Sequence, residues 1–216
     1  TTMSLLRAQQ IIKRNEKGKY VACGSAFRDV LLKHKDRKVA VLSVVGAFRQ
    51  GKSFFQSLNL TYLESPNRAQ GTDFIADDTE FGGFEFRRSI EHVTEGIYVW
   101  PEPFLIKKGS EEIAVILLDS EGAFDSKSDL QQNSAVFGIA AMMSSVTVYN
   151  VLGDVAENIL DSLQFFASYA EAVQKVYHSK STAFQTLLFL VRDYQNGNEF
   201  GMEPGSKLIK KKTIDD

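Results

Sequence analysis

The chain of 216 residues is long enough for one domain with a substantial hydrophobic core. Hydrophobic residues make up 44% of it and charged residues 24%, and a formal net charge of −2 gives no sign of nucleic-acid binding. The single cysteine, Cys23, excludes an intrachain disulfide, and together with three widely spaced histidines it predicts no zinc site. We therefore expect an ordinary globular domain from a reducing compartment.

The N-terminal part of the sequence predicts a hairpin, a helix and a buried strand, in that order. Residues 8–14 and 19–21 flank a Glu-Lys-Gly turn, which is typical of a hairpin at a sheet edge. Residues 26–33 have the spacing of a short amphipathic helix. Residues 39–45 are apolar and rich in β-branched side chains, which indicates a buried strand.

Residues 46–53, Gly-Ala-Phe-Arg-Gln-Gly-Lys-Ser, fit the phosphate-binding pattern G-x-x-x-x-G-K-[ST]. A predicted strand precedes them, and a helical pattern over residues 54–63 follows. This order directs backbone N–H groups and the positive end of a helix dipole at an anion. Lys52 would neutralise the β- and γ-phosphates, and the Ser53 hydroxyl would ligate Mg²⁺. The alternative is a glycine-rich turn that contains Lys and Ser by chance.

The middle of the sequence predicts a loop and then a group of strands. Residues 64–83 are polar and aperiodic, which favours a long surface loop. Residues 96–100, 104–106 and 113–118 are strand-like, with a turn at 108–110. We expect these strands to form the antiparallel hairpin that small GTPase-like folds contain.

Asp119-Ser120-Glu121-Gly122 follows the strand at 113–118 and fits the D-x-x-G motif of P-loop GTPases. Asp119 would reach the metal through its water shell, and the Gly122 amide could sense a γ-phosphate. The alternative is a type I turn that begins with Asp. Thr94 lies between the two motifs and just before a strand, so its position alone makes it the candidate for a second Mg²⁺ hydroxyl.

Residues 130–153 carry no charged side chain, yet they predict no membrane span. A span needs about 20 predominantly apolar residues, and Gln, Asn, Ser and Thr interrupt this stretch. Its character also changes at Ser144, from small helix-forming residues to β-branched ones. A buried helix followed by a buried strand is the better interpretation.

Asp193 follows a predicted buried strand at residues 186–191 and is the candidate for guanine recognition. Its carboxylate can accept hydrogen bonds from guanine N1 and N2, which adenine cannot supply. A solvated turn is the alternative for the Arg192-Asp193 pair. The segment Ser-Lys-Ser-Asp at 126–129 imitates the common [NT]-K-x-D motif, but it lies too close to Gly122 to follow another strand. We interpret it as the start of the next helix.

Buried strands alternate with helices, including a predicted helix over residues 154–177, which indicates an α/β fold with a mostly parallel sheet. Taken together, the motifs resemble the atlastin branch of the dynamin-related GTPases, close to the guanylate-binding proteins. The segments that carry the resemblance are residues 46–54, 94–100, 117–126, 144–150 and 190–194. The resemblance implies a P-loop GTPase fold, the dynamin-like G domain, with an antiparallel edge hairpin and helices on both faces of the sheet.

The same resemblance implies a Mg²⁺-dependent enzyme that converts GTP to GDP and dimerises through its G domain. Such proteins tether and fuse membranes at the cytosolic face of the endoplasmic reticulum. The implied nucleotide-binding residues are Arg49, Gln50, Gly51, Lys52, Ser53, Phe54, Arg87, Glu121, Gly122, Arg192 and Asp193. The implied catalytic residues are Arg49, Lys52 and Thr94, and the metal ligands are Ser53, Thr94 and Asp119.

Individual roles follow by motif match. Arg49 would be an arginine finger supplied in cis when two G domains meet, and Arg87 would help to hold the switch or the phosphates. Glu121 stands where atlastins commonly carry Gln and guanylate-binding proteins carry Glu. An anionic Glu121 near the γ-phosphate could hinder or retune nucleotide binding.

The chain also departs from the family in length, because it ends soon after Asp193. We expect residues 1–216 to be a soluble G domain, truncated at the C-terminus, without the guanine-capping loop and the membrane segments. A guanine-nucleotide-binding or dimerising module with little turnover is an alternative. An ATP-dependent P-loop kinase is a further one, but it would need a lid and an acceptor-binding base that the sequence does not show.

Overall fold

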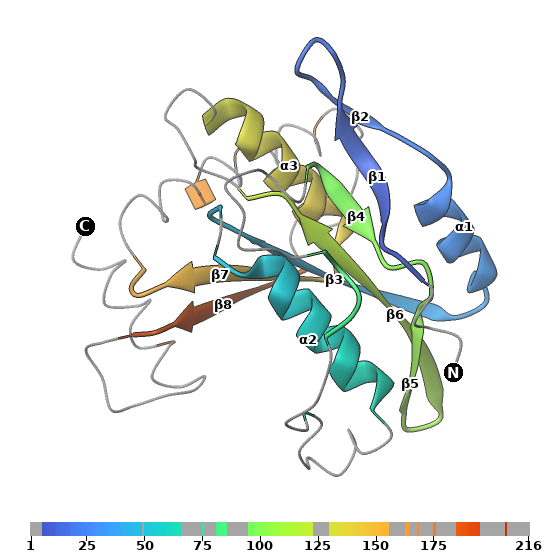
Figure 1. Cartoon of the computed structure of the whole chain (residues 1–216). Helices are drawn as coiled ribbons and strands as arrows, with labels where there is room; N and C mark the ends of the chain where they lie inside the picture. Colours follow the sequence, from blue (N-terminus) through green and yellow to red (C-terminus); the bar gives the residue numbers. More distant parts are fainter. Residues whose placement is uncertain are drawn as a thin grey trace.

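The computed structural model of the chain describes residues 6–48, 50–65, 75, 81–85, 95–122, 130–155, 163–164, 168, 175, 185–194 and 206. Within these residues, eight strands form one sheet with the order β2-β1-β4-β6-β3-β7-β8, and β5 pairs with β6 beside this path (Figure 1). The strands are β1 (Gln9–Arg14), β2 (Tyr20–Ala22), β3 (Lys38–Gly46), β4 (Ile97–Val99), β5 (Phe104–Lys108), β6 (Glu111–Ser120), β7 (Val146–Leu152) and β8 (Thr186–Arg192). The helices are α1 (Ala26–Lys33), α2 (Lys52–Glu64) and α3 (Leu130–Met143).

The parallel part of the sheet consists of β6, β3, β7 and β8. The ends of β3 and β6 are buried on both sides, as expected for parallel strands with helices on both faces. The β1–β2 hairpin occupies the other edge of the sheet, and β1 runs antiparallel to β4. Both β4 and β5 run antiparallel to β6. The predicted α/β fold, with a parallel core and an antiparallel edge hairpin, is therefore confirmed.

Helices cover both faces of the sheet, as predicted (Figure 1). On one face, Val30 of α1 and Phe137 of α3 pack in a core with Ile116 of β6. On the other face, Leu60 of α2 packs in a second core with Leu117 of β6. Because successive side chains of a strand point to opposite faces, neighbouring residues of β6 contribute to the two cores.

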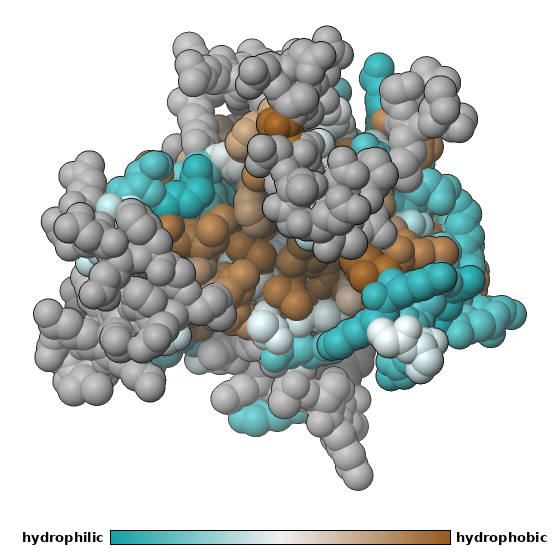
Figure 2. All heavy atoms as spheres, turned by 90° about the horizontal axis from the view of Figure 1, so that it is seen from below, coloured by the Kyte–Doolittle hydropathy of each residue, from teal (hydrophilic) through white to brown (hydrophobic). Residues whose placement is uncertain are grey.

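The uncharged stretch at residues 130–153 folds as α3 followed by β7, which confirms the prediction of a helix and then a strand. Among the described residues, no helix is long and apolar enough to cross a membrane. Seen from below, hydrophobic side chains lie in the middle of the described surface and hydrophilic ones lie around them (Figure 2). Exposed large hydrophobic side chains include Leu32, Leu105 and Leu152, which belong to three separate elements.

The structure extends several predicted elements by one or two residues. Helix α2 begins at Lys52 rather than at residue 54, because Gly51 serves as its N-cap in a left-handed conformation. Strand β6 begins at Glu111, where pairing with Lys108 of β5 closes the predicted hairpin. The predicted loop at 64–83 and the predicted helix at 154–177 lie mostly outside the described residues, and residues 126–129 lie wholly outside them.

Candidate functional site

The loop between β3 and α2 is bounded by two glycines that no other residue would replace easily. Gly46 has φ 144°, and a Cβ atom added there would collide with the carbonyl oxygen of Asn150 on the neighbouring strand. Gly51 has φ 73°, in the left-handed region that favours glycine. The loop therefore turns tightly from the end of β3 into the N-terminus of α2, where the backbone N–H groups of the first helical turn favour an anion.

Lys52, the first residue of α2, is buried with only 6% of its surface exposed. Its Nζ donates a hydrogen bond to the Ala47 carbonyl at 2.9 Å, so the side chain folds back over the loop. Burial lowers the pKa of Lys52 to about 8, against the opposing effect of the Asp119 and Glu121 carboxylates. A buried ammonium held over such a loop is suited to binding a phosphate group. The negative charge of the phosphate would offset the free energy that the ammonium loses by desolvation.

Ser53 and Asp119 join the loop to the end of β6. The Ser53 hydroxyl donates a hydrogen bond to Asp119 Oδ2 at 2.6 Å, and Asp119 is 1% exposed. A hydroxyl and a carboxylate are oxygen ligands of the kind that Mg²⁺ prefers. No group of three or more His, Cys, Asp and Glu residues that could hold a metal ion occurs among the described residues. This donor set fits Mg²⁺ that takes its other ligands from phosphates and water.

Gly122 brings the D-x-x-G segment directly against the loop. A Cβ atom at Gly122 would collide with the backbone of Phe48. Only a glycine lets these two backbones approach so closely. The segment that follows β6 and the loop that follows β3 therefore form one continuous surface next to Lys52.

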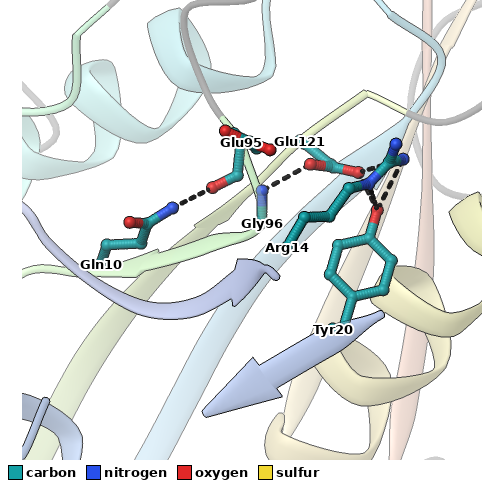
Figure 3. A network of polar contacts seen from close by, with 6 residues as sticks. All are labelled: Gln10, Arg14, Tyr20, Glu95, Gly96 and Glu121. Atoms are coloured by element: carbon teal, nitrogen blue, oxygen red, sulfur yellow. Dashed lines mark hydrogen bonds and ion pairs between the residues drawn. The ribbon is translucent and has the colours of Figure 1, made fainter. Parts of the chain in front are cut away.

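The carboxylate of Glu121 points to the β1–β2 hairpin (Figure 3). Its Oε1 accepts a hydrogen bond from the Tyr20 hydroxyl and forms an ion pair with Arg14 Nη2 at 3.4 Å. Its Oε2 accepts a hydrogen bond from the Gly96 N–H at 2.5 Å. The backbone N–H of Glu121 donates in turn to the Gly96 carbonyl at 2.8 Å. The side chain is 8% exposed, so this set of partners holds a largely buried anion.

Arg14 and Tyr20 are themselves bonded to each other. Arg14 Nε and Nη2 donate to the Tyr20 hydroxyl oxygen at 3.2 and 3.1 Å, and the guanidinium carbon lies 5.3 Å from the ring centroid. Burial, and then the hydrogen bond to Glu121, raise the pKa of Tyr20. The phenol is therefore protonated near neutral pH, and its O–H donates a hydrogen bond to the carboxylate. Nearby on β1, Gln10 Nε2 donates to the Glu95 carbonyl at 2.6 Å (Figure 3).

Arg192, at the end of β8, is partly buried and contacts the loop. Its Nε donates to Asn150 Oδ1 at 2.8 Å, and its Nη2 donates to the Gln50 carbonyl. Asn150 Nδ2 donates to the same carbonyl at 2.6 Å. Asp193 follows with φ 54°, a left-handed conformation that Asp tolerates better than most residues. The roles of Arg192 and Asp193 in reading a base stay predictions.

The structure thus brings many of the predicted site residues to one edge of the sheet. These are Gln50, Gly51, Lys52, Ser53, Asp119, Glu121, Gly122 and Arg192. Phe54 is described as well, but its side chain is 39% exposed and its ring makes an edge contact with Phe81 at 5.4 Å. Arg49, Arg87 and Thr94 lie outside the described residues, so their roles stay predictions.

Sequence reasoning did not single out Asn150, Arg14 or Tyr20. Asn150 carried a usable signal, because it is a polar residue near the end of a predicted buried strand that lies next to the loop strand in a parallel sheet. Arg14 and Tyr20 carried none, because nothing local relates them to Glu121, which is more than 100 residues away in the sequence. Their proximity depends on the order of the strands.

A buried strand that runs through a glycine-bounded loop into a helix, beside an acidic side chain on the adjacent parallel strand, defines the class of P-loop nucleotide-binding domains. The sequence model of the family "Guanylate-binding protein, N-terminal domain" matches residues 19–212. The chain belongs to this family.

Similar full-length proteins are atlastins from several vertebrates. The chain is 38% identical over 194 residues to Atlastin-1 of Bos taurus. The aligned region covers 87% of this chain and 34% of that protein. It is 38% identical over 194 residues to Atlastin-2 of Xenopus laevis, covering 87% and 33% respectively. It is 34% identical over 210 residues to Atlastin-3 of Homo sapiens, covering 94% and 38%. The chain therefore spans about a third of the length of these curated relatives.

Proposed function

We propose that this chain is a Mg²⁺-dependent G domain that binds GTP and hydrolyses it to GDP and phosphate. The observation that carries the proposal is the junction of Lys52, Ser53 and Asp119 where the ends of β3 and β6 meet α2. The alternative of a chance glycine-rich turn gives no reason for a buried lysine beside a hydroxyl–carboxylate pair. The family assignment supports guanine nucleotide as the ligand.

In this proposal, the described residues mainly position and neutralise the triphosphate. Lys52 contacts the β- and γ-phosphate oxygens, and the N–H groups at the start of α2 bind further oxygens. Ser53 and Asp119 would hold Mg²⁺, Asp119 through a water molecule, and the ion would neutralise charge on the phosphates. The Gly122 amide faces the γ-phosphate. Hydrolysis joins the water oxygen to the γ-phosphorus and breaks the bond between the γ-phosphorus and the β–γ bridging oxygen.

The remaining roles rest on the sequence. Arg49 would stabilise the charge that develops on the phosphates in the transition state, Thr94 would add a second hydroxyl to Mg²⁺, and Arg87 would hold the switch segment or the phosphates. We further propose that two copies of the domain pair when GTP is bound. Such pairing would serve to tether and fuse endoplasmic reticulum membranes from the cytosolic side. The similarity to atlastins supports this assignment.

The nucleotide preference follows from the carboxylate of Asp193. We expect GTP and GDP to bind in preference to ATP, because only guanine offers N–H donors at both N1 and N2. Losing hydrogen bonds to a charged group costs about 1.5–3 kcal/mol each, so Asp193→Asn should weaken GDP binding by about tenfold or more. Xanthine nucleotides should be affected least.

The measurement is calorimetric titration of GDP, GTP, xanthosine diphosphate and ATP into the parent and the variant, with Asp36→Asn, at an exposed turn before β3, as a matched surface control. Equal affinity of the parent for ATP and GTP would rule out guanine recognition. Tight GTP binding without phosphate release would instead favour a binding or dimerising module.

A further inference from the structure

Glu121 places a negative charge close to the proposed phosphate site. It lies between Ser120, at the end of β6, and Gly122, which packs against Phe48 of the loop. It is also one of the two carboxylates that act electrostatically on Lys52. A free carboxylate in this position would repel a triphosphate, since like charges at close range in a partly buried site interact strongly.

The β1–β2 hairpin supplies a positive charge and a hydrogen-bond donor to the Glu121 carboxylate. Arg14 provides a positive charge to Glu121 Oε1 at 3.4 Å, and Tyr20 donates a hydrogen bond to the same oxygen. The Gly96 N–H occupies the other oxygen at 2.5 Å. Figure 3 shows the carboxylate held between Gly96 on one side and the Arg14–Tyr20 pair on the other. Both carboxylate oxygens are therefore bonded by groups of β1, β2 and Gly96, the residue before β4.

We propose that Arg14 and Tyr20 are positioning residues for GTP, which hold and neutralise the Glu121 carboxylate so that the γ-phosphate can bind beside it. The proposal rests on the proposed function, because it assumes that a triphosphate occupies the site. In this proposal the β1–β2 hairpin contributes to nucleotide specificity, because it allows the site to accept a γ-phosphate next to the acidic side chain of Glu121. GDP lacks that phosphate, so the hairpin matters less for GDP.

The experiment compares the affinities of a non-hydrolysable GTP analogue and of GDP, measured by titration with Mg²⁺ on the full chain. Arg14→Met removes the positive charge beside the Glu121 carboxylate. It should weaken the GTP analogue by about tenfold and GDP by less than about threefold. Lys13→Met is the matched control, because Lys13 is an exposed cation on the same strand. The control should leave both affinities within about twofold of the parent.

The Glu121→Gln background separates a charge effect from a structural one. In that background the side chain at position 121 is neutral, so adding Arg14→Met should leave the ratio of GTP-analogue to GDP affinity unchanged within about twofold. Arg14→Lys, which retains the charge, should keep the parent ratio. Tyr20→Phe should lower GTP-analogue affinity in the same direction as Arg14→Met, and it provides the test if Arg14→Met does not fold.

Two results would overturn the proposal. One is an unchanged affinity ratio in a folded Arg14→Met or Tyr20→Phe variant. The other is an equal loss in the Glu121→Gln background, which would make the hairpin contacts merely structural. Failure of the parent to bind any guanine nucleotide would instead refute the proposed function.

Discussion

At the scale of single residues, Lys52 shows the conflict between stability and function most clearly. Its ammonium is buried, and the desolvation that lowers its pKa to about 8 also disfavours the folded state while the lysine is charged. While no nucleotide is bound, the buried positive charge that attracts phosphate therefore lowers the free energy of unfolding. Residues at such sites are commonly replaceable by ones that stabilise the fold and reduce the activity.

Lys52→Met should therefore raise the free energy of unfolding of the nucleotide-free protein at pH 7 by about 1–2 kcal/mol. It should also weaken GTP binding by about 10–100-fold, because it removes charged hydrogen bonds to phosphate. Since folding lowers the pKa of Lys52, the destabilisation by its buried charge is full below pH 8. It fades as the pH approaches 10.5, the ordinary pKa of a lysine in an unfolded chain. Urea unfolding and GTP titration provide the two measurements.

Lys33→Met is the matched control for this variant. Lys33 forms an exposed ion pair with Glu102 at 3.0 Å, and such surface pairs contribute about 0–1 kcal/mol. The Lys33→Met variant should therefore change the affinity for GTP little. A clear loss of stability in Lys52→Met would contradict the view that burial of this charge is costly.

At the scale of elements, the order of the strands decides which residues meet. Strand β3 lies between β6 and β7, so the loop after β3 has Asp119 on one side and Asn150 on the other. Asn150 is 1% exposed and bonds the Gln50 carbonyl of the loop as well as the Arg192 guanidinium of β8. The ends of β6, β7 and β8 thus contact the phosphate loop and the start of α2.

Asn150→Ala should break this connection. It leaves the partly buried Gln50 carbonyl with one donor fewer, so the free energy of unfolding should fall by about 1–3 kcal/mol. The loop should also become less ordered, which would weaken GDP binding. Asn59→Ala is a matched control, because the Asn59 side chain bonds Gln56 within α2 at 3.1 Å. Chemical denaturation and GDP titration give the readouts, and an unchanged GDP affinity in Asn150→Ala would argue against this role.

Local sequence patterns predicted the elements well because each pattern has a local cause. The run of β-branched residues before Gly46 and the glycines of the loop predict a strand, a turn and a helix without knowledge of the rest of the chain. Strand order has no such local cause. The pairing of β1 with β4 brings Arg14 and Tyr20 to Glu121, and hydrophobic periodicity contains no information about that pairing. The position of Asp119 at the end of a strand was predictable to within two residues, whereas the surroundings of Glu121 were not.

At the scale of the whole molecule, the family assignment and the site support one account. The family model covers residues 19–212, nearly the whole chain, while the chain spans about a third of the atlastins that it resembles. The G domain is the part that binds and hydrolyses nucleotide in our proposal. If two copies pair around the nucleotide, pairing should order Arg49 on the phosphates and couple hydrolysis to protein concentration.

The most direct test of this account is the rate of phosphate release from GTP with Mg²⁺, measured for the parent and Arg49→Ala at several protein concentrations. We predict that the parent releases phosphate and that its rate per molecule rises with concentration. Arg49→Ala should be slower by a factor on the order of 10³, with GDP affinity nearly unchanged. A rate independent of concentration would contradict the coupling to pairing. A folded parent that binds GTP in Mg²⁺ and releases no phosphate at any concentration would contradict the central claim.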